Sequence, residues 1–473
     1  MTAADIDTSQ PHVEPPDPVG EAVTRVLAGV MFGASVGLSH QHPGEDSHTG
    51  LEGPGSVSAT ASGPDGWETT CTVCLDERIA GLLQEGSEPL MEMLGGLPAA
   101  GLRAAERFRG TAVDPVTGRL DPAVRRALRD VVAAEVLADY VPSSADQAHK
   151  AALVGEVIEY LVELSSTRVE SHDLTHGVLI ADVLEEDPRL LFDYPADVRA
   201  AKRAPLLFDG QRSVLVVDGH GHARTELQWH RIDRLATDDV TLEPALSPAG
   251  RRMASPRRSV ALVESGSLVA AASRRLGGLG FFLRADRSIW TFLSGRPFLV
   301  RRGEHWSAFP LQLAALVERM IGGGEAAGIV VDAAFIVSGD RGGAILAIVD
   351  DASAIDGTVP LKDRYDLRDD VDPLAMRPET KLHHLIDAKD IDDVTLARLA
   401  LLDGATIVDR DGRLLAYGAI VDSADSEHEG ARTAAAKSLS KTAMVVLKVS
   451  ADGDITVFRD GRVVATLLGP PPL

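Results

Sequence analysis

The sequence has little of what marks a secreted, disulfide-bonded or membrane-spanning protein. Its 473 residues include only two cysteines, Cys71 and Cys74, and so few thiols fit a reducing compartment. The apolar run at residues 26–38 is too short to cross a bilayer. Asp5 and Asp7 stand where a secretory signal would carry basic residues. We therefore expect a cytoplasmic protein without membrane segments.

Aromatic residues and positive charge are also scarce. Aromatic residues make up 4% of the chain and apolar residues 45%, so the cores must be aliphatic and rich in alanine. The 47 basic residues are outnumbered by 70 acidic ones, which gives a net charge of −23. That charge repels duplex DNA, and the pairs Arg251-Arg252, Arg257-Arg258 and Arg301-Arg302 are too small to make a DNA-binding face. DNA is therefore not expected as a partner.

A chain of this length can form two to four domains, and its composition changes along the sequence. Residues 1–68 hold few large apolar side chains, apart from one short helix expected within 20–38, so we predict that they are largely disordered. Residues 69–174 carry apolar side chains at three- and four-residue steps, with prolines between the runs, which predicts a helical region. An α/β domain is predicted at 175–310 and a second one at 311–473.

Strand-type and helix-type patterns alternate in the last two regions. The middle region has predicted strands at 213–217, 281–283, 289–292 and 298–300. The last region has predicted strands at 344–349, 405–408, 414–421, 444–449, 455–458 and 463–467, and helices at 311–320, 394–402 and 433–439. The fold class expected from this alternation is α/β, with a mixed sheet in the C-terminal domain.

Two predicted hairpins share a spaced pattern. Residues 285–296 and 451–462 have the same Ala, Asp, Ile, Phe, Gly and Arg at matching offsets. Each hairpin follows an alanine-rich helix and an apolar strand. The pattern indicates either a duplicated, degenerate copy of the C-terminal unit within the middle domain or a chance likeness of two hairpins.

Two short motifs in the last region carry candidate chemistry. Asp403-Gly404-Ala405 lies where a predicted helix leads into a strand, so its carboxylate can hold a metal or polarise a hydroxyl. Gly404 has no side chain, so a ligand can approach the backbone closely there. Gly430-Ala431-Arg432-Thr433 opens a helix, whose first N–H groups are free and whose dipole is positive there. With the guanidinium, this helix start can bind a polyphosphate.

The two motifs in this order resemble those of the diadenylate cyclases, a family that joins two ATP molecules into cyclic di-AMP. The family marks are Asp-Gly-Ala and a helix start Gly-Thr-Arg-His-Arg-Ala-Ala, which here read Asp403-Gly404-Ala405 and residues 430–436. The stretches 342–346 and 449–455 resemble the family's opening strand and closing hairpin. The resemblance covers about 150 of the 473 residues. The preceding part, residues 203–306, is similar to sensor domains placed ahead of such cyclases.

The resemblance implies a set of site residues and partners. It implies that a divalent cation, Mn²⁺ or Mg²⁺, binds Asp403, which helps to activate the ribose 3′-hydroxyl. Because each domain would supply half of the reaction, it also implies ATP as ligand and a face-to-face homo-oligomer. The implied catalytic residues are Asp403 and Arg432, and the implied nucleotide-binding residues are Gly404, Ala405, Gly430, Ala431, Thr433 and Ser450.

Of the family's first arginine, histidine and second arginine in the second motif, only the first arginine is kept, as Arg432. Thr433 replaces the family's histidine, and Ala434 replaces its second arginine. Two functions therefore remain open: a diadenylate cyclase under the control of an N-terminal sensor region, and a catalytically inactive adenine-nucleotide sensor. A DNA-scanning role, as in cyclase relatives with a DNA-binding domain, is disfavoured by the acidic charge.

Cys71 and Cys74 form a CxxC pair, which is too small for a tetrahedral zinc site unless His40, His42 or His48 completes it. A zinc site and a redox pair are both weaker interpretations than two ordinary thiols.

His172, Asp173 and His176 have a spacing that metal ligands can use. A structural polar cluster is the favoured interpretation. His383-His384 is expected to be ordinary surface.

Overall fold

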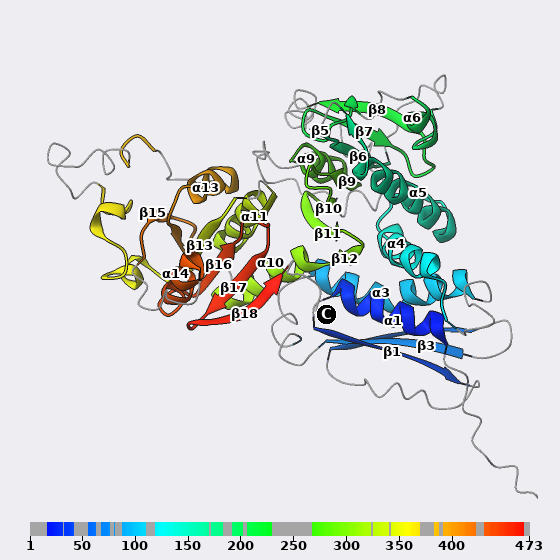
Figure 1. Ribbon diagram of the computed structural model, residues 1–473, viewed down its shortest axis with the longest axis horizontal. Coiled ribbons are helices and arrows are strands. Elements are labelled where there is room, and N and C mark those ends of the chain that lie inside the picture. The colour runs from blue at the N-terminus through cyan, green and yellow to red at the C-terminus, as the bar shows by residue number, and fades with distance from the viewer. Residues whose placement is uncertain are drawn as a thin grey trace, which may run out of the picture.

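The computed structural model of the chain is described for the following residues: 17–31, 33–41, 55–62, 68–75, 80, 88–109, 119–169, 172–182, 192–201, 206–228, 267–322, 325–339, 342–368, 383–386, 391–421 and 430–467. The fold is α/β with mixed sheets, in which a seven-stranded and a six-stranded sheet follow a small N-terminal sheet (Figure 1). Within these ranges no helix is long and apolar enough to cross a membrane.

The N-terminal part combines two helices with a three-stranded antiparallel sheet of order β1-β3-β2. Asp17 caps the first helix, where its carboxylate accepts a hydrogen bond from the Val19 N–H at 3.1 Å. The helices contact the sheet through α1 on β1 and α3 on β2 and β3. The elements are α1 (Pro18–Val30), β1 (Ala34–Gln41), β2 (Ser56–Ser62), β3 (Glu68–Leu75) and α3 (Glu88–Phe108).

This small sheet corrects the prediction of disorder for residues 1–68, because β1 and β2 lie within that range. The region predicted as helical from residue 69 likewise begins on β3. Large apolar side chains are rare in β2, so its sequence does not indicate a strand that packs on a core. Hydroxyl pairs across the strands help to hold it instead: Ser58 to Thr72 at 2.8 Å and Thr60 to Thr70 at 2.9 Å.

The two cysteines lie on β3, three residues apart. Because side chains alternate along a strand, their thiols point to opposite faces. Cys71 is buried, and burial raises the pKa of its thiol to about 12. His40 pairs with Thr69 at 2.9 Å. The opposite orientations favour two ordinary thiols, as predicted, over a zinc site or a redox pair. Among the described residues no group of three or more His, Cys, Asp or Glu could hold a metal ion, and His42 and His48 lie outside the described residues.

The middle part is a sheet of order β12-β11-β10-β9-β6-β7-β8. Its β6 and β7 run parallel, and the other neighbours are antiparallel. Its elements are α4 (Pro122–Ala138), α5 (Gln147–Ser165), β4 (Arg168–Val169), β5 (His172–Asp173), β6 (His176–Ile180), α6 (Ala196–Ala200), β7 (Ser213–Val217), β8 (Ala223–Gln228), α9 (Ser267–Leu276), β9 (Leu279–Leu283), β10 (Ile289–Leu293), β11 (Arg296–Arg302) and β12 (His305–Ser307).

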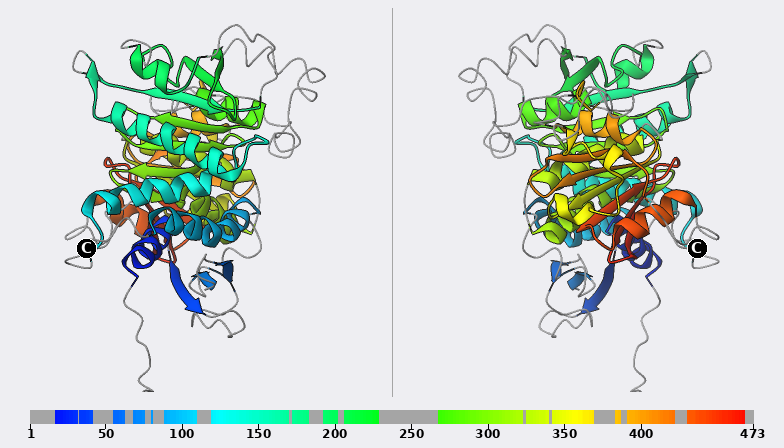
Figure 2. Two further views of the ribbon diagram at one scale, coloured as in Figure 1. Left: turned by 90° about the vertical axis from the view of Figure 1, so that its right-hand side faces the viewer. Right: turned by 90° about the vertical axis from the view of Figure 1, so that its left-hand side faces the viewer.

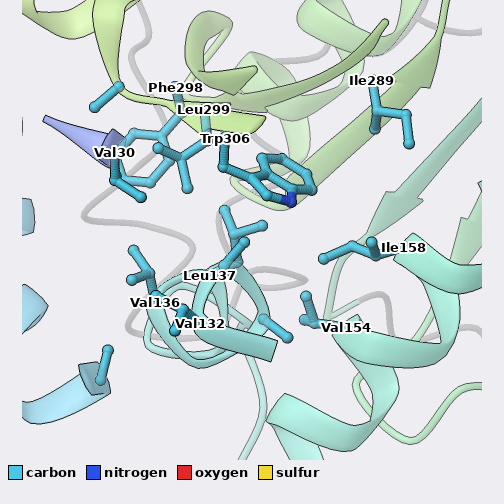
Figure 3. Close-up of a cluster of buried hydrophobic side chains, with 14 of the residues drawn as sticks. Val30, Val132, Val136, Leu137, Val154, Ile158, Ile289, Phe298, Leu299 and Trp306 are labelled. Carbon is cyan, nitrogen blue, oxygen red and sulfur yellow. The ribbon is translucent and has the colours of Figure 1, made fainter. Parts of the chain in front are cut away.

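Helices α4 and α5 cover one face of this sheet and close an aliphatic core (Figure 3). Trp306 belongs to this core, and its indole N–H donates to Asp130 of α4 at 2.7 Å. The side chains labelled in Figure 3 are Val30, Val132, Val136, Leu137, Val154, Ile158, Ile289, Phe298, Leu299 and Trp306.

The C-terminal part is a sheet of order β15-β14-β13-β16-β17-β18. Its β13 and β14 run parallel, and the other neighbours are antiparallel. Its elements are α10 (Phe309–Ile321), α11 (Glu325–Gly339), β13 (Ala344–Val349), the 3-10 turns η3 (Ala352–Ile355) and η4 (Leu361–Asp363), α13 (Asp393–Ala400), β14 (Ala405–Asp409), β15 (Leu414–Ala419), α14 (Ala431–Leu439), β16 (Val445–Val449), β17 (Ile455–Arg459) and β18 (Arg462–Leu467).

The two large sheets share a core that includes α10 and α11. Three aromatic rings join them: Trp290 of β10 meets Phe309 of α10 at 5.9 Å and Phe335 of α11 at 5.8 Å between ring centroids. The C-terminal part, in yellow to red, lies on the side of the middle sheet opposite α4 and α5 (Figure 2).

Burial decides the interpretation of two histidines, while the side chains of His172 and Asp173 lie outside the described residues. His176 is buried at the start of β6 and shares a hydrogen bond of 3.2 Å with the Tyr194 hydroxyl, so it is a structural residue. The prediction that His383 is surface is wrong: it is buried and packs against the rings of Tyr365 and Tyr417. His384 is exposed.

Candidate nucleotide site

The candidate site lies at the end of the C-terminal sheet where strands β13 and β14 begin and strand β16 ends. Strand β14 starts beside β13, since Ala405 pairs with Ile345 in the parallel ladder. Strand β16 runs the other way and ends there, since Val449 pairs with Ala344. The topology therefore brings Asp403-Gly404 and Ser450, which are distant in the sequence, to the same end of the sheet.

Asp403 follows α13 and directly precedes Gly404, the last residue before β14. Its side chain is exposed, and its carboxylate has no hydrogen-bond or ion-pair partner among the described residues. Gly404 has φ +109°, and a Cβ built on it would overlap the backbone of Gly418 in β15. Glycine is therefore required here, and it lets the chain turn into the strand while leaving the carboxylate free.

Helix α14 presents its N-terminus to the same end of the sheet. Gly430 is the N-cap without a side-chain capping bond, and its carbonyl accepts from Thr433 at 2.8 Å and Ala434 at 3.1 Å. The N–H groups of Ala431 and Arg432 have no acceptor in the described part of the chain. Free amides at the positive end of a helix dipole favour an anion.

The guanidinium of Arg432 lies against Gly343, just before β13. A Cβ built on Gly343 would overlap that guanidinium, so the glycine makes room for it. Arg432 forms no ion pair with any described carboxylate. The Gly342-Gly343 pair, which the sequence suggested only as the start of a strand, thus helps to position a site residue.

Lys448 is a site residue that the sequence motifs did not reveal. It lies on β16, where it pairs with Ile345, and its ammonium donates to the Thr433 hydroxyl at 3.1 Å. Lys448 is half-buried and has no ion-pair partner among the described side chains. A second cation therefore stands beside the first turn of α14. No local motif marks it, because its nearness to Thr433 comes from strand register and helix packing.

Ser450 begins the β16–β17 turn. Its hydroxyl accepts from the N–H of Asp454 at 3.1 Å, and its own N–H donates to the Asp454 carbonyl at 2.8 Å. Arg302, from the middle sheet, holds the outside of the turn by donating to the Asp452 carbonyl at 2.7 Å and the Asp454 carboxylate at 3.2 Å. Burial raises the pKa of Asp454, while the charge of Arg302 opposes that shift.

This arrangement fits a nucleoside triphosphate. Arg432, Lys448 and the α14 amides offer positive charge and donors, and neither side chain forms an ion pair with a described carboxylate. Asp403 offers one free carboxylate, and Mg²⁺ is commonly held by one or two carboxylates together with substrate phosphates. The residues present are therefore compatible with a divalent cation that arrives with the nucleotide.

Comparison with protein families agrees with this geometry. Residues 331–463 match the family DAC, described as DisA bacterial checkpoint controller nucleotide-binding. The match runs from within α11 into β18 and includes every site residue described above. No curated protein and no solved structure matches the chain. The C-terminal part of the chain is therefore a DAC domain, the diadenylate-cyclase-like nucleotide-binding domain that its two motifs resemble.

Proposed function

We propose that this protein is a diadenylate cyclase that condenses two ATP molecules into cyclic di-AMP and two pyrophosphates. The observation that carries the proposal is one end of the sheet of a DAC domain, where Asp403, Arg432 and Lys448 lie and none of the three forms an ion pair with a described residue. Nucleotidyl transfer uses such charges, because cations stabilise the phosphates while a carboxylate acts on the attacking hydroxyl.

The phosphate-binding step falls to the start of α14. The N–H groups of Ala431 and Arg432, which have no acceptor among the described residues, can donate to an anion at the helix start, and the Arg432 guanidinium adds a forked, charged donor. Lys448 holds the Thr433 hydroxyl at 3.1 Å and brings a point charge to the same place. We assign the triphosphate to the start of α14 beside Lys448, which we call the phosphate corner. We assign the nucleoside to the surface formed by Gly404, Ala405 and Ser450.

Asp403 is assigned to the attacking hydroxyl. A divalent cation bound with the nucleotide supplies charge stabilisation at the phosphates. The Asp403 carboxylate orients the ribose 3′-hydroxyl by accepting a hydrogen bond from it, which increases the negative charge on the attacking oxygen. Asp403 would also hold the divalent cation. Gly404 keeps the carboxylate close to the ligand because it carries no side chain of its own.

The reaction needs two such sites. Each 3′-oxygen forms a bond to the α-phosphorus of the other ATP, and the bond from that phosphorus to the β-phosphate bridging oxygen breaks. The electron pair leaves with pyrophosphate, and each 3′-hydroxyl proton is released. Since one site holds one nucleotide, we propose that two DAC domains meet face to face in a homo-oligomer.

The competing function is an adenine-nucleotide sensor that does not cyclise. Thr433 and Ala434 favour it, because the family's histidine and second arginine are missing. Ala434 is buried against the sheet, and Lys448 reaches the first turn of α14 from the strand behind it. That lysine restores one of the missing charges, so we favour the enzyme. Control by a sensor region remains part of this proposal.

Calorimetry of ATP binding to the full chain in the presence of Mn²⁺ tests the shared part of both functions. Arg432→Ala should weaken binding roughly tenfold to a hundredfold, since a charged hydrogen bond contributes about 1.5–3 kcal/mol. Arg413→Ala is the matched control, because Arg413 is exposed in the turn after β14, at the other end of the strand. Equal affinities for the two variants would contradict the assignment of the phosphate corner.

A further inference from the structure

The middle and C-terminal sheets have the same connectivity. In each, the first strand is parallel to the second and antiparallel to the fourth, and the third strand lies at an edge. Strands β6, β7, β8, β9, β10 and β11 thus take the places of β13, β14, β15, β16, β17 and β18. Only β12 has no counterpart among the described strands.

The strand registers also coincide. Leu283 pairs with Ile289 in the middle sheet, as Val449 pairs with Ile455 in the C-terminal sheet. The next pair of strands carries an irregularity at the same place in both sheets, just before the phenylalanine that they share. A chance likeness of two hairpins does not reproduce a bulge.

The turns are built with the same hydrogen bonds. The N–H of Gly295 donates to the Ser273 hydroxyl of α9 at 2.9 Å, and the N–H of Gly461 donates to the Ser440 hydroxyl after α14 at 3.1 Å. Each serine hydroxyl in turn bonds to the carbonyl three residues earlier.

A second pair of turns follows the second strand of each sheet. Asp218 caps the N–H groups two and four residues later at 2.9 Å each, and Asp409 does the same at 3.0 and 2.8 Å. In both turns the glycine three residues on has a positive φ, Gly221 at +91° and Gly412 at +84°.

The helices cover corresponding faces. Ile289 of β10 belongs to the core under α4 and α5, and its counterpart Ile455 belongs to the core that includes α10 and α11. Phe292 and Phe458 face the other way in their sheets, toward α9 and α14 respectively. Two helices before the first strand and one helix before the fourth strand therefore repeat in both parts.

We propose that residues 122–302 are a second copy of the DAC fold whose nucleotide site has been lost, so that each chain holds one nucleotide. The copy keeps the strands and turns that form the fold. The polar and glycine positions that form the site in the C-terminal domain are occupied differently.

The lysine of the site has become a phenylalanine. Phe282, which pairs with Trp290, stands where Lys448 pairs with Thr456. Phe282 is buried, and its ring is so close to Gly210 that a Cβ on that glycine would overlap it. An apolar ring therefore fills the place of the cation that reaches α14.

The glycine that accommodates Arg432 has also changed. Thr175 precedes β6 at the place of Gly343 before β13, so the space for a guanidinium against the backbone is closed. Beside it, His176 is buried and its ring stacks with that of Tyr194 at 6.1 Å between centroids.

The copy has no carboxylate at the position of Asp403. The register that places Asp218 on Asp409 puts Arg212 there, because each lies the same distance before its turn aspartate (212–218 and 403–409).

The preceding carboxylate, Asp209, lies three residues earlier and is bound within its own loop. Its Oδ1 accepts from the N–H groups of Gln211 at 2.9 Å, Arg212 at 2.6 Å and Ser213 at 3.3 Å. Asp403 has no such partners in the described part of the chain.

The consequence for the reaction rests on the proposed function. Because cyclic di-AMP needs two nucleotides, and the middle copy cannot hold one, the two DAC folds of a single chain cannot complete the reaction. The second nucleotide must come from the C-terminal domain of another chain.

Equilibrium dialysis of the full chain with Mn²⁺ and an ATP analogue that resists cleavage between the α- and β-phosphates measures the stoichiometry. We expect one analogue per chain at saturation. The double variant Arg432→Ala, Lys448→Ala should lose that one, and Arg212→Ala in the middle copy should keep it. Two per chain, or one that survives the double variant, would overturn the loss of the site.

Absence of binding to the wild type would instead contradict the proposed function. The duplication itself is then decided by a crystal structure of the full chain. We expect its two sheets to superpose with Ile289 on Ile455 and Asp218 on Asp409. Different strand orders in the two sheets would refute the second copy, whatever the nucleotide result.

Discussion

Lys448 of β16 donates a hydrogen bond to the hydroxyl of Thr433 in the first turn of α14, at 3.1 Å. Thr433 stands where the cyclase family has a histidine. The lysine therefore returns a positive charge to a helix start that has lost one. This pair is the main reason to regard the departures as a variant site and not as a decayed one.

Removal of that charge should weaken ATP binding. Lys448→Met keeps the aliphatic stem but leaves no donor for the phosphates, and we expect roughly a tenfold to hundredfold loss of affinity. Lys441→Met serves as the control, because Lys441 is an exposed lysine just after α14. Calorimetry with ATP and Mn²⁺ measures both, and the same affinity in the two variants would exclude Lys448 from the site.

Asp403→Asn should separate binding from chemistry. The amide keeps the shape but cannot ionise to bind a cation or polarise the 3′-hydroxyl, so we expect at least roughly a hundredfold slower product formation with little change in ATP affinity. Asp411→Asn is the matched control in an exposed turn. A loss of ATP affinity as large as the loss of rate would assign Asp403 to binding instead.

Gly404→Ala should destabilise the fold. The backbone there has φ +109°, and the added methyl group would meet the Gly418 backbone, so we expect a loss of roughly 1–3 kcal/mol in the free energy of unfolding. Gly430→Ala is the control, since Gly430 has φ −59° and open space around it. Urea denaturation compares the two, and equal midpoints would contradict the close approach of β14 and β15.

The carboxyl of Asp393 should make the stability of the fold depend on pH. Burial and the nearby Asp332 raise the pKa of its carboxyl from 3.8 to about 7. The folded state therefore holds this proton more tightly than the unfolded state does. The free energy of unfolding is highest, with respect to this group, below pH 3.8, and it falls as the pH rises from 3.8 to about 7. Relative to the wild type, Asp393→Asn should gain roughly 2 kcal/mol more at pH 8.5 than at pH 5.5.

Urea denaturation at the two pH values measures this gain. Asp460→Asn is the control, because Asp460 is an exposed turn residue. A pH-independent difference between wild type and Asp393→Asn would show that the carboxyl ionises normally.

All six strands of the C-terminal sheet and strands β7, β9, β10 and β11 of the middle sheet could be predicted from the sequence, because apolar runs and glycine turns mark their limits. Strands β6, β8 and β12 and helix α11 were not predicted. The site motifs at Asp403 and Arg432 could be found as well, since each has a local pattern. Strands β1 and β2 could not be predicted, because they are rich in small and hydroxyl side chains, a composition that is typical of loops. Lys448 was missed for another reason: only the register of β16 and the packing of α14 bring it to Thr433.

The central claim is tested most directly by incubating the purified full chain with ATP and Mn²⁺ and separating the products. We predict cyclic di-AMP and pyrophosphate in a ratio of one to two, with neither formed by Asp403→Asn. A wild type that binds ATP in the same buffer but forms no cyclic di-AMP would contradict the account and identify the domain as a nucleotide sensor.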